Sequence, residues 1–392
     1  MNMNTNDIIK KYDGAVMNTY ARNPAAPISG GGASATDADG NRLIDFGAGV
    51  GVNSLGFANE AWADAVSEQA KKLQHTCNLY YNQPAAEFAA RLTGVTGYDK
   101  LFFANSGAEA NECAIKLARK FSFDKFGKGR PVIITLTGSF HGRTLCTLSA
   151  TGQQSMHDWF FPFVEGFKHV PPNDPGALRE AITPDVCAIM FEPIIGEGGV
   201  LELTRDYIDT IFELAGEYGL LTIADEVQTG AGRTGKILCM EHFGRQADIT
   251  TMAKGVGGGL PIGICLAKGG AAETLTPGTH GTTFGGNPVV CAGASVVLDT
   301  ILAPGFLGEV ARKGDKIKSE LQKMPKVKEI SGKGLMIGVT LGGISAAEAV
   351  SRALSRGLMC LTAKDKLRFL PPLTVSEDEL AAGIEILREI LG

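Results

Sequence analysis

The sequence predicts an α/β fold: a large domain with a mostly parallel central sheet, and a smaller α+β domain formed by the N- and C-terminal segments. Short apolar runs alternate with helical patterns between about residues 100 and 268, as in a sheet covered by helices on both faces. From about residue 305 the order changes to helix, strand, helix, strand and final helix. A length of 392 residues accommodates both domains. We expect an N-terminal segment (1–50) that joins the small domain, a large domain (51–304) and a C-terminal domain (305–392).

The N-terminal segment is predicted to contain a helix followed by a β-hairpin. Asp39 and Gly40 lie between two strand-like runs, at residues 33–36 and 42–46, and Asp-Gly is a common two-residue hairpin turn. Two amphipathic helices are predicted next, at residues 59–74 and 84–92.

The helices and strands of the large domain follow from local signals. Ser106 and Glu109 have the spacing of a capping box, so a helix is predicted to begin there. Gly219 is predicted to end the helix at 204–218, because glycine readily adopts the left-handed conformation. The most apolar stretch, 288–307, is predicted to be one buried helix and not a membrane span. The predicted strands cover residues 100–104, 131–137, 186–192, 220–224, 262–267 and 334–341.

Charge and composition argue against several classes of protein. A net charge of −5 and a pI near 5.8 disfavour a nucleic-acid-binding protein, which usually carries a basic patch. The six histidines and eight cysteines show neither H-E-x-x-H nor C-x-x-C spacing, so we expect no metal site. The N-terminus lacks the apolar run of a signal peptide, and the cysteines lie mostly in apolar runs. Both observations favour a cytoplasmic protein that acts away from membranes.

A carboxylate pair and a lysine mark the candidate site. Asp225 and Glu226 follow the apolar run 220–224, and open α/β sheets bind their ligands at the carboxyl ends of strands. Lys254 lies between an apolar-polar run and the glycine cluster 255–259, where the backbone can approach a bulky group. A lysine of this kind can form a Schiff base with an aldehyde cofactor, and an upstream carboxylate can keep a pyridine nitrogen protonated.

Plainer interpretations of these residues remain open on spacing alone. A lysine is usually a solvated surface charge, and an Asp-Glu pair at a strand end often belongs to a turn or a helix cap. The glycine cluster could also be a phosphate loop. It does not match G-x-G-x-x-G before a helix, however, because Pro261 and a strand-like run follow it.

Three motifs carry a resemblance to a known family. They are DEVQTGAGRTG (225–235), AKGVGGGLPIG (253–263) and GTTFGGNP (281–288). The chain resembles the class III, pyridoxal-phosphate-dependent aminotransferases, and within them it is most similar to the acetylornithine aminotransferases. The resemblance extends from about residue 17 to residue 380. It implies the type I fold of pyridoxal-phosphate enzymes and a homodimer with shared active sites.

The resemblance also implies roles for individual residues at the cofactor. Lys254 would hold pyridoxal 5'-phosphate as a Schiff base and then move protons, and Asp225 would pair with the pyridinium nitrogen. A helix N-terminus opened by Gly107 and Ala108 suits a phosphate, because its N–H groups are free and its dipole is positive. The remaining implied cofactor contacts are Phe140 against the ring, Glu226, Val227 and Gln228 beside it, and Thr283 at the phosphate of the other subunit.

Substrate contacts follow from the same resemblance. Arg143 and Arg368 match the two carboxylate-binding arginines of the family, and a guanidinium binds a carboxylate bidentately. Glu197 matches an acidic gate that masks Arg368, and Thr282 would lie near the substrate. The family's usual glutamine is replaced here by Ile195.

The implied reaction moves the terminal amine of N-acetyl-L-ornithine to 2-oxoglutarate. The products would be N-acetylglutamate 5-semialdehyde and L-glutamate, in a step of arginine biosynthesis. Ornithine, succinylornithine and 4-aminobutyrate are alternative donors within the class. A non-transaminating pyridoxal-phosphate enzyme and a nicotinamide-dependent dehydrogenase are more remote alternatives.

Overall fold

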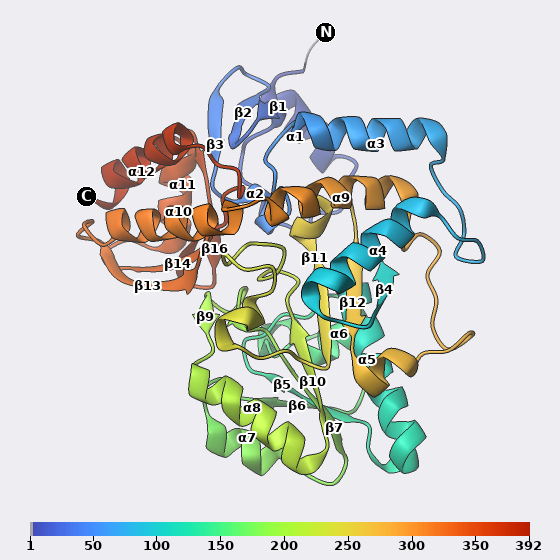
Figure 1. Ribbon diagram of the computed structural model, residues 1–392. Coiled ribbons are helices and arrows are strands. Elements are labelled where there is room, and N and C mark those ends of the chain that lie inside the picture. Colours follow the sequence, from blue (N-terminus) through green and yellow to red (C-terminus); the bar gives the residue numbers. More distant parts are fainter. Residues whose placement is uncertain (1–2) are drawn as a thin grey trace.

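A seven-stranded sheet forms the centre of the large domain in the computed structural model, which describes residues 3–392 (Figure 1). The strand order is β4, β12, β11, β10, β7, β5, β6. Only β12 runs antiparallel to its neighbours within this part of the chain. The strands are β4 (Lys100–Ala104), β5 (Val132–Leu136), β6 (Phe167–Val170), β7 (Val186–Phe191), β10 (Leu221–Asp225), β11 (Ile249–Ala253) and β12 (Gly263–Ala267). The predicted, mostly parallel sheet is confirmed.

Helices cover this sheet on both faces, which explains why β7, β10, β11 and β12 are buried at every position. On one face α5 packs its small residues against alternate strand residues such as Ile133 and Ile223. On the other face α8 packs Tyr207 and Ile211 against Ile134. The covering helices are α5 (Gly107–Phe126), α6 (Leu145–Ala150), α7 (Pro175–Ala181) and α8 (Arg205–Tyr218).

Local hydrogen bonds begin and end these helices. Ser106 Oγ accepts from the Glu109 N–H (3.2 Å) at the start of α5. The predicted capping box is nevertheless incomplete. The Glu109 carboxylate accepts from the N–H of Asn105 (2.6 Å), one residue before the cap, because the chain turns there out of β4. Gly219 ends α8 in the left-handed conformation, as predicted.

The N-terminal segment forms a small sheet with part of the C-terminal region. Its predicted hairpin is present, but residues 38–41 separate the strands, so the two-residue turn is wrong. The Asp37 carboxylate accepts from the N–H groups of Asp39 (3.0 Å) and Asn41 (2.8 Å), which stabilises this wider turn. The elements are α1 (Thr5–Asp13), β1 (Pro27–Gly31), β2 (Ser34–Asp37), β3 (Arg42–Asp45), α2 (Ala48–Gly51), α3 (Glu60–Lys72) and α4 (Gln83–Thr96). Residues 1 and 2 of the predicted segment 1–50 lie outside the described residues.

The C-terminal region begins where the predicted helix 288–307 divides. That single helix is wrong, because Pro304 and Gly305, which has φ 81°, separate α9 from α10. β13 was not predicted, and it pairs antiparallel with β14. The elements are α9 (Pro288–Leu302), α10 (Phe306–Leu321), β13 (Val327–Lys333), β14 (Met336–Leu341), α11 (Ala346–Leu354), β15 (Leu358–Met359), β16 (Leu361–Ala363), β17 (Lys366–Phe369) and α12 (Glu377–Leu391).

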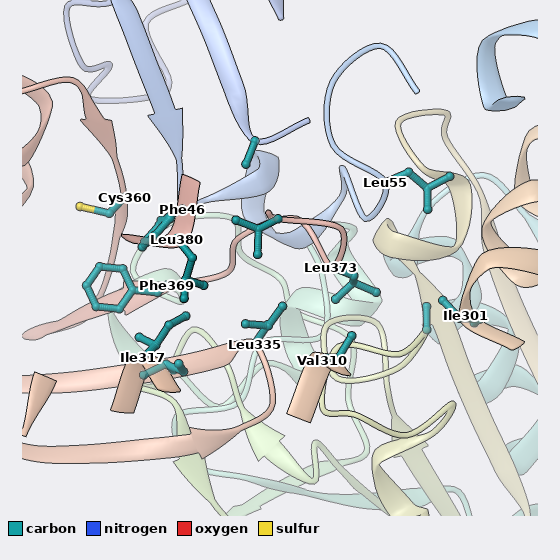
Figure 2. Packing of buried hydrophobic residues seen from close by; sticks show 14 of the residues in the cluster. Phe46, Leu55, Ile301, Val310, Ile317, Leu335, Cys360, Phe369, Leu373 and Leu380 are labelled. Carbon is teal, nitrogen blue, oxygen red and sulfur yellow. The ribbon is translucent and has the colours of Figure 1, made fainter. Parts of the chain in front are cut away.

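The two chain ends pack together. β15 pairs in parallel with β3, so the first and last parts of the chain share one sheet. Figure 2 shows Phe46 beside Phe369 and Leu380, and the two phenyl rings meet edge to face with centroids 6.1 Å apart. This packing supports a small domain made from both termini, and the boundaries at residues 50 and 304 stay a prediction.

In residues 3–392 no single helix is both long and apolar enough to cross a membrane. Within the described residues, only α9 and α10 taken together are long and apolar enough, and a bend of 74° separates them.

Gly263 provides a test of how β12 positions the start of α5. A Cβ at Gly263 would lie 2.1 Å from the carbonyl oxygen of Ser106, the residue that caps α5. We expect Gly263→Ala to destabilise the protein by about 1–3 kcal/mol through overpacking, measured as a lower urea midpoint.

The matched control is Gly94→Ala on the exposed face of α4. A Cβ at Gly94 would meet no atom within 4 Å. This change should leave stability unchanged or raise it by about 0.5–1 kcal/mol, since alanine favours a helix over glycine. Equal effects of the two substitutions would contradict the close packing of β12 against the start of α5.

Candidate active site

A cavity of about 420 Å³ lies at the carboxyl ends of the central strands. It is where ligands of open α/β sheets bind. Asp225 ends β10, and Lys254 directly follows β11. The other predicted site residues that line it are Gly107, Ala108, Phe140, Arg143, Glu197, Val227 and Gln228.

Lys254 occupies a strained position on the cavity wall. Its φ of 49° lies in the left-handed region, which a lysine rarely adopts, and such strain is concentrated at functional sites. Burial lowers the pKa of the Lys254 amine, although the nearby charge of Glu197 opposes this effect. A larger fraction of the amine is therefore unprotonated at neutral pH than for an exposed lysine, which makes it a better nucleophile.

Three donors surround the buried carboxylate of Asp225. Asn111 Nδ2 from α5 and His141 Nδ1 from the loop after β5 each lie 2.7 Å from Oδ2. The N–H of Val227 donates to Oδ1 at 3.0 Å. The position of the Asp225 carboxylate is thus fixed by three separate parts of the chain.

Glu192 ties the loop of Phe140 to the loop of Glu197. Its carboxyl group accepts from the N–H of Phe140 (2.8 Å) and from the N–H of Gly196 (3.0 Å). Burial, helped by the charge of Asp225, raises the pKa of Glu192 to about 7. The two hydrogen bonds of Glu192 set the relative position of Phe140 and Glu197, which both line the cavity.

The start of α5 forms one end of the cavity. The first N–H groups of a helix have no partner within it, and the helix dipole is positive there. Gly107 has no side chain to block this end, and a Cβ in its place would lie 2.7 Å from Val227 Cγ1. Gly107 and Ala108 therefore present backbone donors that fit a phosphate group.

Glu197 and Arg368 form an ion pair beside Lys254. Two guanidinium nitrogens of Arg368 lie 2.6 and 3.3 Å from the Glu197 oxygens, and Arg368 is only 3% exposed. Gln228 accepts from Arg368 and donates to Glu197, each at 3.2 Å. Burial opposes ionisation of Glu197, but Arg368 outweighs it and lowers the pKa of that carboxyl. A buried arginine charge is thereby matched without any ligand.

Arg143 is the contrasting arginine. It is exposed at the edge of the cavity, and its guanidinium carbon lies 5.6 Å from the centroid of the Phe140 ring. Across residues 3–392, no carboxylate lies within 4.0 Å of it. Arg143 is thus positioned to bind a carboxylate brought by a ligand.

The structure leaves four predicted site residues out of the cavity lining. Arg368 is buried behind it and contacts the lining residues Glu197 and Gln228. Glu226 turns away from the cavity, because its carboxylate accepts from the N–H groups of Cys239 and Met240 (2.9 Å for Met240), and this burial raises the pKa of Glu226 to about 7. Thr282 and Thr283 line a separate surface depression, where Thr282 Oγ1 accepts from Asn105 at 3.3 Å. Within the chain, neither threonine lines the cavity.

Sequence reasoning missed Asn111, His141 and Glu192. An asparagine inside a helix carries no signal of function. Its position one and a half turns after Ser106 could only have been interpreted with α5 placed against β10. His141 follows Phe140 directly, so its neighbourhood was visible, but its bond to Asp225 joins residues 84 apart.

Comparison with known proteins gives the family of the chain and several similar proteins. The family model "Aminotransferase class-III" matches residues 17–391. An acetylornithine aminotransferase of Haemophilus ducreyi is 50% identical over 390 residues, covering 99% of both chains. The structure of an ornithine aminotransferase from Toxoplasma gondii superposes with a TM-score of 0.95 at 30% identity, covering 99% of this chain and 94% of that one. An N-acetylornithine aminotransferase from Stenotrophomonas maltophilia gives 0.84 at 32% identity, covering 97% and 98%.

These matches confirm the predicted type I fold of pyridoxal-phosphate enzymes. The residues present also fit that cofactor. The cavity offers an amine for its aldehyde, free N–H groups for its phosphate and a buried carboxyl group for its ring nitrogen. The chain therefore belongs to the class III aminotransferases, whose cofactor is pyridoxal phosphate.

Proposed function

We propose that this transaminase moves the terminal amine of N-acetyl-L-ornithine to 2-oxoglutarate, giving N-acetylglutamate 5-semialdehyde and L-glutamate. One observation carries the proposal: two arginines at the cavity are in opposite states, because Arg143 lines it unpaired, whereas Arg368 lies behind the lining residue Glu197 and is paired with it. Such a site suits two unlike substrates. The 50% identity to a protein named acetylornithine aminotransferase supports the choice of donor. The reaction would be a step of arginine biosynthesis.

The two substrates differ in where their carboxylates lie. Glutamate carries one beside its reacting amine, whereas acetylornithine reacts at its far end and carries none there. With acetylornithine bound, Glu197 would stay paired with Arg368, so that no buried guanidinium is left unpaired. With 2-oxoglutarate bound, its α-carboxylate would replace Glu197 on Arg368. Arg143 would bind the distal carboxylate in both cases.

The remaining roles concern the cofactor. When bound, pyridoxal phosphate supplies an aldehyde that takes the amine and a ring that accepts electrons. We propose that Lys254 Nζ holds the cofactor and afterwards carries the proton between the two reacting carbons. Asp225, held in position by Asn111 and His141, would pair with the ring nitrogen and keep it protonated. Phe140 and Val227 would hold the ring between them, and Gln228 would lie near its phenolic oxygen.

Ornithine is the second candidate donor, because the T. gondii ornithine aminotransferase has the same fold over 99% of this chain. Free ornithine has a charged α-amine where the acetylated donor has a neutral amide. Succinylornithine and 4-aminobutyrate are further alternatives. Steady-state turnover of each amine with 2-oxoglutarate separates them. A tenfold or greater preference for free ornithine or 4-aminobutyrate would overturn the proposed donor.

We also propose a cytoplasmic homodimer with shared active sites. Leu79 and Tyr81 are 88% and 105% exposed, and Phe284 is 60% exposed, which is unusual for large apolar side chains. Asn78 donates to the carbonyl oxygens of Thr282 and Gly285, so this apolar surface adjoins Thr283. If a second copy of the chain covered this apolar surface, Thr283 of the first copy would lie at the cavity of the second copy.

Replacement of Lys254 tests the cofactor attachment. Lys254→Ala should lower the rate of turnover about a thousandfold or more, because both the tether and the proton carrier are lost. It should still bind pyridoxal phosphate, since the phosphate and ring contacts remain. Borohydride should attach the cofactor to Lys254 alone in the unaltered protein, as measured by peptide mass spectrometry. The exposed Lys236→Ala is the control, and label on any other lysine would refute the assignment.

Replacement of Arg368 tests the proposed exchange of carboxylates. Arg368→Ala should weaken transition-state binding by about 2–5 kcal/mol in the 2-oxoglutarate half-reaction, and much less in the acetylornithine half-reaction. Stopped-flow absorbance of each half-reaction measures the difference. The surface variant Arg356→Ala should change neither. Equal losses in both half-reactions would exclude the gate formed by Glu197.

Subunit mixing tests the shared site. Thr283→Glu should be inactive by placing a carboxylate against the phosphate, and Lys254→Ala is inactive for the reason above. In a hybrid dimer one site would carry both changes and the other neither. A 1:1 mixture should therefore recover about one quarter of the unaltered activity. Absence of recovery after subunit exchange, verified by native mass spectrometry, would place Thr283 outside the partner's site.

A further inference from the structure

The hairpin that carries Glu197 has an unusual backbone. β8 (Ile194–Ile195) and β9 (Leu201–Glu202) pair antiparallel, and residues 196–200 connect them. Val200 ends this connection with φ 50°, in the left-handed region. A β-branched residue rarely adopts that conformation, and here its side chain is fully buried. The surrounding packing must therefore favour valine at this position strongly enough to overcome the strain.

The packing comes from the C-terminal sheet. A Cβ on Gly338 would lie 2.6 Å from Val200 Cβ, and a Cβ on Gly332 would lie 3.1 Å from Val200 Cγ1. Both positions are glycines, so β13 and β14 leave space that the valine fills. Polar contacts reinforce this attachment, because Glu202 accepts from the N–H of Gly332 (2.7 Å) and pairs with Lys333 (2.9 Å).

This contact lies next to the ion pair. Gly338 on β14 is the cross-strand partner of Arg368 on β17. Val200 is three residues after Glu197, whose carboxylate meets Arg368. The same hairpin therefore approaches the C-terminal sheet at two adjacent points, once through a valine in a glycine-lined space and once through an ion pair.

We propose that Val200 is a positioning residue that holds Glu197 against Arg368 and so sets the balance between the two substrates. The inference rests on the proposed function, in which Glu197 and a substrate α-carboxylate compete for Arg368. Loosening the hairpin would weaken the Glu197–Arg368 pair. A ligand with an α-carboxylate would then bind more tightly. A donor without one beside its reacting amine would bind less tightly, because Arg368 would be unpaired in its presence.

Val200→Gly is the first test, because glycine adopts the left-handed conformation easily and the fold should persist. We expect the apparent dissociation constant of acetylornithine to rise and that of 2-oxoglutarate to fall, with their ratio changing about tenfold or more. Each is measured by stopped-flow absorbance in its own half-reaction. Glutarate, an unreactive dicarboxylate, should also bind the variant more tightly by calorimetry, which is independent of turnover.

Gly338→Ala approaches the same contact from the other side and keeps the test decisive if Val200→Gly is poorly folded. Its added methyl would push Val200 away, so it should change the ratio in the same direction. The control is Ala58→Gly, which relieves φ 47° at an exposed position remote from the hairpin in sequence. It should leave both constants unchanged.

Two outcomes separate this inference from the proposed function. If Arg368→Ala affects the half-reactions unequally but Val200→Gly and Gly338→Ala change both constants by the same factor, Val200 has only a structural role and the inference is wrong. If Arg368→Ala affects both half-reactions equally, the exchange of Glu197 for a substrate carboxylate on Arg368 is wrong. The proposed function is then contradicted at that step, independently of Val200.

Discussion

The buried carboxylate of Asp225 is the interaction on which the geometry of this site depends. It draws its hydrogen bonds from a helix, from the loop after β5 and from the chain that follows β10. A buried carboxyl group without hydrogen-bond partners costs several kcal/mol. These hydrogen bonds therefore favour the arrangement in which all three parts of the chain meet the Asp225 oxygens. Asn111 fixes the rotation of α5, and His141 fixes the loop that carries Phe140 and Arg143. One carboxyl group thus joins three parts of the cavity wall.

The sequence was sufficient to predict the features that depend on local pattern and strand order. Buried parallel strands are continuous apolar runs, so β7 and β10 could be located, and with β10 the position of Asp225 at a strand end. β11 was not predicted, because two threonines interrupt its apolar residues. It was not sufficient where neighbours in space decide the structure. Nothing near Asn111 in sequence indicates Asp225. The apolar pattern of 288–307 continues past Pro304, although the chain bends there.

Family resemblance and local physics contributed different parts of the site prediction. The resemblance named Glu197 and Arg368, which no spacing would connect across 171 residues, and the structure brings them together. It also named Glu226, which directly follows the end of β10 and does not line the cavity. Its carboxylate accepts hydrogen bonds from the N–H groups of Cys239 and Met240, two contacts that sequence spacing does not indicate.

The antiparallel direction of β12 has an electrostatic consequence for Lys254. A parallel neighbour of β11 would have required a crossover, usually a helix that begins beside the lysine. Instead the chain reverses through residues 254–262, and Ala253 pairs with Gly263. Gly263 in turn pairs with Ala104, just before α5. The reversal, which contains the short 3-10 helix 254–257, therefore links the lysine to the start of α5 without a full α-helix whose positive end would compete for the same anion or repel a protonated lysine.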